Sequence, residues 1–169
     1  EDFAAQFDAL VAARPAVASF TFGILTAAQV ARLQAVGSYV IGTATTLAEA
    51  QAWAAVGADA VCASGMEAGG HRGTFLTPTQ PGATGVAPSL ADFAASMVGT
   101  LPLVAQCVQA LSIPVIAAGG IMDGRGITGA LALGAQAVQM GTAFLTCPES
   151  AIGTAYREAL TRAQATDTR

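Results

Sequence analysis

The sequence contains a single imidazole. His71 is the only histidine among the 169 residues, and it lies in the glycine-rich stretch Gly-Met-Glu-Ala-Gly-Gly-His-Arg-Gly that runs from Gly65 to Gly73. An imidazole titrates near neutral pH, so a histidine in such a loop can serve as a general base or donate a hydrogen bond to an anion. A structural or surface role is the competing interpretation, and the residue types alone leave both open.

Two charged residues flank this histidine. Glu67 is interpreted first as a loop carboxylate and alternatively as the group that orients the imidazole. Arg72 is either a solvated side chain or a group that pairs with an anion. Neither choice is settled by the sequence.

Two further stretches have the composition of a phosphate site. They are Gly119-Gly120 and Gln139-Met140-Gly141-Thr142. Glycine lets backbone N–H groups approach a phosphate closely, and a threonine hydroxyl adds one donor. Taken alone, each stretch is more often a turn than a phosphate site, but two of them on neighbouring strands make the two interpretations about equal.

The three cysteines predict no disulfide framework and no metal site. Cys62, Cys107 and Cys147 are far apart and odd in number, and none forms a Cys-x-x-Cys pair. We expect small buried side chains in a reducing compartment, and therefore a cytoplasmic protein.

The elements that position these residues follow a repeated pattern. Ala35–Thr43, Ala55–Gly65 and Ala132–Thr142 each leave a helical segment at a glycine and continue as a short apolar run. The glycine fits the C′ position of a helix, which needs a positive φ. A continuous apolar run predicts a strand covered on both faces. Ala16–Phe22 and Pro114–Gly119 are predicted strands of the same kind.

Helices are predicted between these strands. Thr46 and Glu49 have the spacing of a capping box at the start of one of them. The expected helices are an amphipathic N-terminal helix over residues 1–15, Thr26–Val36, Thr46–Val56, a stretch over Leu90–Leu111 interrupted near Gly99 and Pro102, and a helix through Thr128–Leu133 that opens at Asp123.

The spacing predicts five βα units in one domain, residues 1–169. Strands begin near residues 17, 39 and 60, about 21 to 22 residues apart, which suits parallel neighbours. Five units do not close a (β/α)8 TIM barrel. The chain is therefore either an open doubly wound sheet or a partial barrel with strands 4 to 8 present and the first three units missing. In both folds ligands bind at the carboxyl ends of the strands, and a phosphate site after the last two strands favours the barrel.

Composition excludes several classes of partner. Apolar residues make up 53% of the chain, charged residues 11%, and the net charge is −4. No cluster of lysine and arginine suits nucleic acid, and no apolar run reaches the roughly 18 residues of a membrane span. The long Gly/Pro/Thr-rich loop Thr74–Ser89 follows the histidine directly, and its length raises the hypothesis of a lid.

Together these motifs resemble one known family. Gly65–Gly73, Ala117–Gly126 and Ala132–Leu145 are similar to stretches of nitronate monooxygenase, formerly 2-nitropropane dioxygenase, and the resemblance covers nearly the whole chain. The family consists of FMN-dependent TIM barrels. The resemblance implies that these segments are its strands 4 to 8.

The resemblance also implies roles for individual residues. His71 matches the catalytic histidine. Matches to cofactor-binding positions are implied at Gly69, a flavin-contacting loop glycine, at Ser64, which stands where many members have a glutamine near the flavin, and at Gly119, Gly120, Gln139, Met140, Gly141 and Thr142 around the FMN phosphate and ribityl chain.

The implied reaction is the oxidation of an alkyl nitronate or nitroalkane by FMN and O2 to a carbonyl compound and nitrite. His71 would hydrogen-bond the nitro oxygens and remove the α-proton of a neutral nitroalkane. One alternative is the flavin-dependent enoyl-ACP reductase of fatty-acid synthesis, which shares the fold and the Glu-Ala-Gly-Gly-His core. Another is a non-catalytic barrel fragment that self-associates or pairs with a complementary N-terminal fragment.

Overall fold

A parallel five-stranded sheet forms the centre of the computed structural model, which describes residues 2–76, 89–164 and 167. The strands are β1 (Val17–Phe20), β2 (Tyr39–Ala44), β3 (Ala60–Ser64), β4 (Val115–Ala118) and β5 (Ala137–Gln139). Their order in the sheet is their order in the sequence, and each pairs with the next in parallel. A doubly wound sheet reverses its strand order at a switch point. This sheet advances in one direction only, so the chain has five consecutive units of a (β/α)8 TIM barrel.

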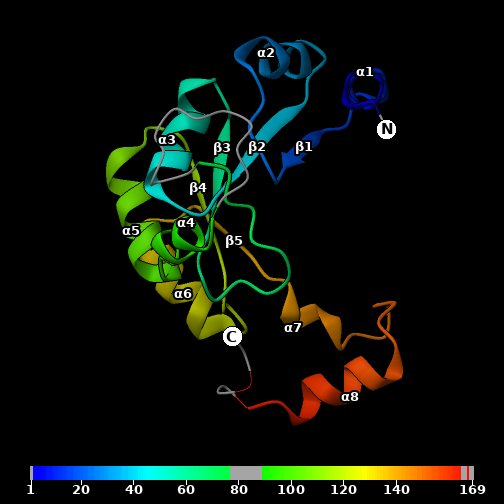
Figure 1. The fold of residues 1–169 in the computed structure, drawn as a ribbon, viewed down its shortest axis with the longest axis vertical. Coiled ribbons are helices and arrows are strands. Elements are labelled where there is room, and N and C mark those ends of the chain that lie inside the picture. Colours follow the sequence, from blue (N-terminus) through cyan, green and yellow to red (C-terminus); the bar gives the residue numbers. More distant parts are fainter. Residues whose placement is uncertain (1, 77–88, 165–166, 168–169) are drawn as a thin grey trace.

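Helices connect the strands, and α2, α3, α5 and α6 lie along one side of the sheet (Figure 1). The segments α7 and α8 extend beyond β5, away from the sheet (Figure 1). The helices are α1 (Phe3–Ala13), α2 (Ala27–Ala35), α3 (Leu47–Ala55), α4 (Leu90–Ala95), α5 (Thr100–Ala110), α6 (Gly124–Ala132), α7 (Thr142–Leu145) and α8 (Thr154–Arg162). No helix within these described ranges is long and apolar enough to cross a membrane.

The ends of the helices agree with the glycines that predict them. Gly37, Gly57 and Gly134 follow α2, α3 and α6 with φ of 90°, 89° and 99°, so the prediction of a positive φ at all three is confirmed. The helical stretch over residues 90–111 breaks before Gly99, the N-cap of α5. Pro102 lies in the first turn of α5, where a missing N–H is tolerated, and does not interrupt it.

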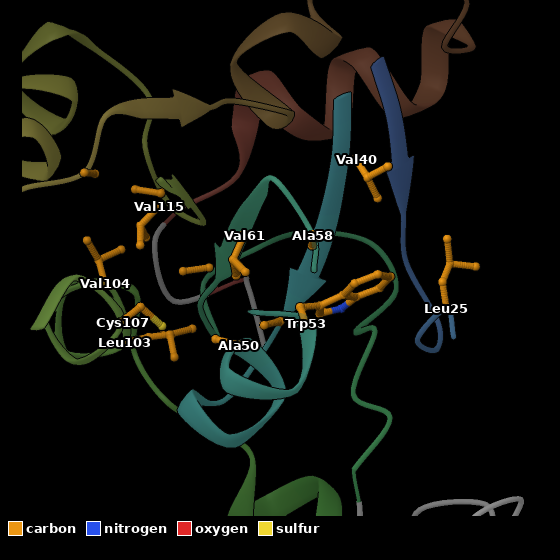
Figure 2. Close-up of a cluster of buried hydrophobic side chains, with 14 of the residues drawn as sticks. Leu25, Val40, Ala50, Trp53, Ala58, Val61, Leu103, Val104, Cys107 and Val115 are labelled. Atoms are coloured by element: carbon orange, nitrogen blue, oxygen red, sulfur yellow. The ribbon is translucent and has the colours of Figure 1, made fainter. Parts of the chain in front are cut away.

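The core lies between the sheet and these helices. Trp53 of α3 is fully buried and lies directly over β2, where Gly42 leaves room for the indole ring. Its Nε1 donates to the carbonyl of Thr43 at 3.1 Å. Figure 2 shows the indole ring directed toward Leu25. Val61 of β3 lies closer than the ring does to the buried α5 side chains, which are Leu103, Val104 and Cys107.

Burial differs between the central and the outer strands. All of β3 is buried except Ser64, as a strand covered on both faces should be. The same prediction is wrong for β1 and β5: Val17 is 53% exposed, and Ala137 and Gln139 are also exposed. These two strands end the sheet and have a neighbour on one side only. Cys62 and Cys107 are buried as expected, but Cys147 is only half-buried because it follows α7, outside the core.

Most of the predicted loop Thr74–Ser89 lies outside the described residues, since residues 77–88 are not among them. Its first residues, Thr74–Leu76, are described and belong to the site.

Candidate active site

Two predicted site residues, Ser64 and Gln139, lie in one row across the carboxyl ends of the strands, with Ala118 between them. Ser64 of β3 is in register with Ala118 of β4, and Ala118 is in register with Gln139 of β5. Gly119 and Gly120 follow β4 directly, so this pair lies between the ends of β3 and β5. Gln139 accepts a weak hydrogen bond from the Sγ of Cys62, 3.7 Å from its Oε1, which ties β5 to β3 across β4.

The turn after β4 depends on glycine at both positions. Gly119 has φ 115° and Gly120 has φ 65°, conformations that other residues rarely adopt. A Cβ on Gly119 would also lie 3.1 Å from the backbone nitrogen of Ala68. Gly120 and Gly141 are exposed, and Gly141 has open space where a Cβ would be. Backbone at the ends of β4 and β5 is thus accessible to a ligand.

The segment Gly65–Leu76, here called the histidine loop, crosses the carboxyl edge of the sheet from β5 to β1. Near its start, a Cβ on Gly69 would lie 3.3 Å from the Oγ1 of Thr142, beside the end of β5. Further along, Gly73 is buried, and its Cβ would lie 2.7 Å from Thr21, just after β1. The loop therefore links the glycine turns to the opposite end of the sheet.

His71 is exposed and its ring contacts Phe22. The two rings are 5.9 Å apart at an interplanar angle of 85°, an edge-to-face arrangement. Phe22 has φ 69°, which is strained for a bulky residue. Strain of this kind concentrates at functional sites. No sequence signal indicated this partner, because Phe22 precedes the histidine by 49 positions and belongs to a different βα unit.

Glu67 does not serve the imidazole. Its Oε2 accepts from the backbone nitrogen and the Oγ1 of Thr100, both at 2.8 Å, at the first residue of α5. The Oγ1 of Thr100 also lies 3.1 Å from the carbonyl oxygen of Gly119. Glu67 therefore caps α5, because the N-cap residue Gly99 has no side chain that could do so. Through Thr100, Glu67 also supports the glycine turn after β4. Of the two interpretations, the plain loop carboxylate is the one with observed contacts.

Arg72 is half-buried and faces inward. Its Nε donates to the Oγ of Ser96 at 3.2 Å, and its Nη2 contacts the carbonyls of Ser96 and Thr45. Burial lowers the pKa of Arg72 from its usual value, against the opposing effect of the negative charges on Glu49 and Glu67. The interpretation as a solvated side chain is wrong, because these inward contacts hold the guanidinium against the segments that follow β2 and α4.

Comparisons with known proteins agree with this architecture. Residues 2–169 match the family model described as nitronate monooxygenase. A nitronate monooxygenase from Pseudomonas aeruginosa is 54% identical over 151 residues, covering 89% of this chain and 39% of the relative. Among solved structures, a nitroalkane oxidase from Streptomyces ansochromogenes matches with a TM-score of 0.84 and 43% identity, covering 94% of this chain and 42% of that one.

A second group of solved structures is more distant. A FabK variant from Thermotoga maritima matches with a TM-score of 0.77 and 34% identity, covering 95% of this chain and 47% of that one. In all three comparisons the chain spans less than half the length of the protein it matches.

Proposed function

The chain belongs to the nitronate monooxygenase family, and we propose on this premise that it carries the flavin-binding and catalytic edge of an enzyme that oxidises alkyl nitronates or nitroalkanes. The products are a carbonyl compound and nitrite, with O2 as the second substrate. The observation that carries the proposal is the histidine loop, which brings the only imidazole of the chain to the same sheet edge as the glycine turns. Residues 1–169 then form one FMN-binding domain of a cytoplasmic enzyme.

The residues present at this edge fit FMN. The positive φ values of Gly119 and Gly120 and the open space at Gly141 provide accessible backbone for a phosphate, beside the hydroxyl of Thr142. Ser64, Gly69, Gln139 and Met140 complete the proposed cofactor positions. When bound, FMN would supply the redox chemistry by accepting electrons from the substrate and passing them to O2.

His71 supplies what the cofactor does not. Its exposed imidazole can hydrogen-bond the nitro oxygens of a nitronate and can accept the α-proton of a neutral nitroalkane. Phe22 supports the ring from one side, which limits the orientations open to it. In this chain the imidazole therefore binds, orients and accepts a proton.

The test uses the purified chain after incubation with FMN. Flavin retained after gel filtration, recorded by its absorbance near 450 nm, reports binding. O2 uptake and nitrite release with propionate 3-nitronate and with a nitroalkane report the reaction. We expect both, and the His71→Ala variant should keep the flavin while losing nitrite release from the nitroalkane. Bound flavin with no nitrite from either substrate would contradict the proposed reaction.

The second candidate is a flavin-dependent enoyl-ACP reductase. The FabK structures support it more weakly, at 34% identity against 43% for the nitroalkane oxidase and 54% for the nitronate monooxygenase. NADH oxidation driven by a crotonyl thioester, without nitrite from nitro compounds, would favour this alternative. A chain that retains no flavin and forms neither product would favour the third, a non-catalytic barrel fragment.

A further inference from the structure

A buried carboxylate holds the segment that follows the histidine. Glu49, in the first turn of α3, is fully buried. Its Oε1 accepts from the backbone nitrogens of Phe75 and Leu76, at 2.6 and 3.0 Å. Its Oε2 accepts from the backbone nitrogen and the Oγ1 of Thr45, both at 2.7 Å. Four donors satisfy this carboxylate, as a buried charge requires, and two of them belong to the histidine loop.

This arrangement differs from an ordinary helix cap. In the capping box expected from Thr46 and Glu49, the carboxylate returns to the backbone nitrogen of Thr46. Only half of the box forms: Thr46 Oγ1 accepts from the Glu49 nitrogen at 3.3 Å, while the carboxylate binds Thr45 and the loop. In α2 the equivalent pair, Thr26 and Gln29, forms the complete box. Glu49 is thus used to join α3 to the histidine loop.

The same loop is held at several neighbouring positions. Thr74 lies between two hydroxyls, 2.9 Å from the Oγ1 of Thr45 and 3.2 Å from the Oγ of Ser96. Arg72 donates to Ser96 and to the carbonyl of Thr45. The ring of Phe75 meets Trp53 edge to face, with 6.4 Å between centroids. Thr45 is therefore shared by the carboxylate, the guanidinium and the Thr74 hydroxyl.

We infer that Glu49 is a positioning residue for His71. It fixes Phe75 and Leu76, and with them the end of a short segment whose other end is the histidine. The imidazole is exposed, and its ring contacts Phe22. Its position therefore depends on the backbone of the histidine loop, which Glu49 binds at Phe75 and Leu76. The inference rests on the proposed function for its catalytic consequence. The positioning itself can be measured without any reaction.

The single histidine makes that measurement direct. The imidazole carbon-bound protons of His71 are the only such signals in the chain, and the edge-to-face contact with Phe22 should shift them from the values of a free histidine. Proton NMR of the folded chain with and without Phe22→Ala establishes this shift. Glu49→Gln keeps the size of the side chain but replaces one accepting oxygen with an NH2 group, so two of the four donors lose their acceptor.

We expect Glu49→Gln to move the His71 signals toward the free values. In the flavin-loaded chain we also expect it to reduce kcat for a nitroalkane by about tenfold to a hundredfold. Retained flavin should not change, because the glycine turns do not contact Glu49. The matched control is Gln29→Ala, which removes a side chain at the same position of α2 and should leave the His71 signals in place. If Glu49→Gln does not fold, Thr74→Val removes the hydroxyl contacts of the histidine loop to Thr45, which Glu49 also binds, and to Ser96, and so tests the same attachment of the loop more mildly.

Two results separate the inference from the proposed function. A folded Glu49→Gln or Thr74→Val chain whose His71 signals are unchanged would overturn the positioning role. Signals that move in these variants, in a chain that binds flavin but forms no nitrite in any version, would support the positioning role while contradicting the proposed reaction.

Discussion

At the scale of single residues, the proposed chemistry depends on one nitrogen of His71. We predict that His71→Asn, which keeps a hydrogen-bond donor but has no basic nitrogen, loses about 10²–10⁴-fold in turnover of a neutral nitroalkane. A preformed nitronate needs no proton removal, so its turnover should fall much less. Nitrite release from both substrates at one pH measures the difference. Equal losses with the two substrates would contradict a role as base.

The buried thiols allow a second prediction. Burial raises the pKa of Cys62 and of Cys107 to about 11 each, whereas an unfolded cysteine titrates near 8.5. The folded chain at pH 8 should therefore react with iodoacetamide first at half-buried Cys147, as peptide mass spectrometry would show.

The same shifts fix a pH dependence of stability. The folded state favours the neutral thiols, so their contribution to the free energy of unfolding is complete below the unfolded pKa and is lost as the pH rises toward 11. The urea midpoint should fall over that range, and less so in a Cys62→Ala, Cys107→Ala variant. If the urea midpoint fell by the same amount with rising pH in both chains, the two buried thiols would not be the cause of this pH dependence.

Residue types indicated His71 as a site residue, but they did not indicate Glu49 as the residue that positions its loop. The imidazole is visible in the sequence because the chain has only one histidine and four glycines lie within the nine residues around it. Glu49 was visible only as a helix cap, since a Thr-x-x-Glu pattern describes contacts within one helix. Its bonds to Phe75 and Leu76 join residues 26 and 27 positions apart. Local spacing carries no information about such contacts.

At the scale of elements, β2 and α3 pack closely at Gly42. A Cβ on Gly42 would overlap the indole ring of Trp53, which is fully buried and cannot move away. We predict that Gly42→Ala destabilises the chain by about 1–3 kcal/mol, the usual effect of overpacking a core. The midpoint of urea unfolding at constant slope measures the change.

A matched glycine in α6 gives the opposite expectation. Gly129 lies within the helix, is exposed and has nothing within 4 Å of an added Cβ. Gly129→Ala should therefore stabilise the chain by about 0.5–1 kcal/mol, because alanine loses less backbone entropy in a helix. If both alanine variants shifted the midpoint in the same direction, the packing explanation for Gly42 would be wrong.

Elements with local signals were predicted well, and those without them were not. Capping residues and C′ glycines define α2, α3 and α6, because these interactions lie within a few residues of each helix end. The helices α7 and α8 were not foreseen. Both begin at a glycine that makes no side-chain cap, so neither has the usual N-terminal signal.

At the scale of the whole molecule, the spacing of the βα units left the strand order open, whereas the placement of the glycine motifs and the family resemblance predicted the barrel that the structure shows. Regular spacing of βα units predicts parallel neighbours in either a barrel or a doubly wound sheet. The two folds differ only in whether the order reverses, and that is decided by packing of the helices on one side or on both. The strand order without reversal, with α2, α3, α5 and α6 along one side of the sheet, reflects the barrel arrangement.

This arrangement leaves the outer edges of β1 and β5 unpaired within the described part of the chain. Val17 is 53% exposed, and its partner in register, Tyr39, is 41% exposed, so an apolar surface accompanies the β1 edge. Unpaired edges of this kind promote association between chains. We predict that the 169-residue chain self-associates with rising concentration, as light scattering coupled to gel filtration would show. Val17→Lys places a charge at that edge and should shift the distribution toward monomer. A native chain that stays monomeric throughout the concentration range would show that its edges are protected in some other way.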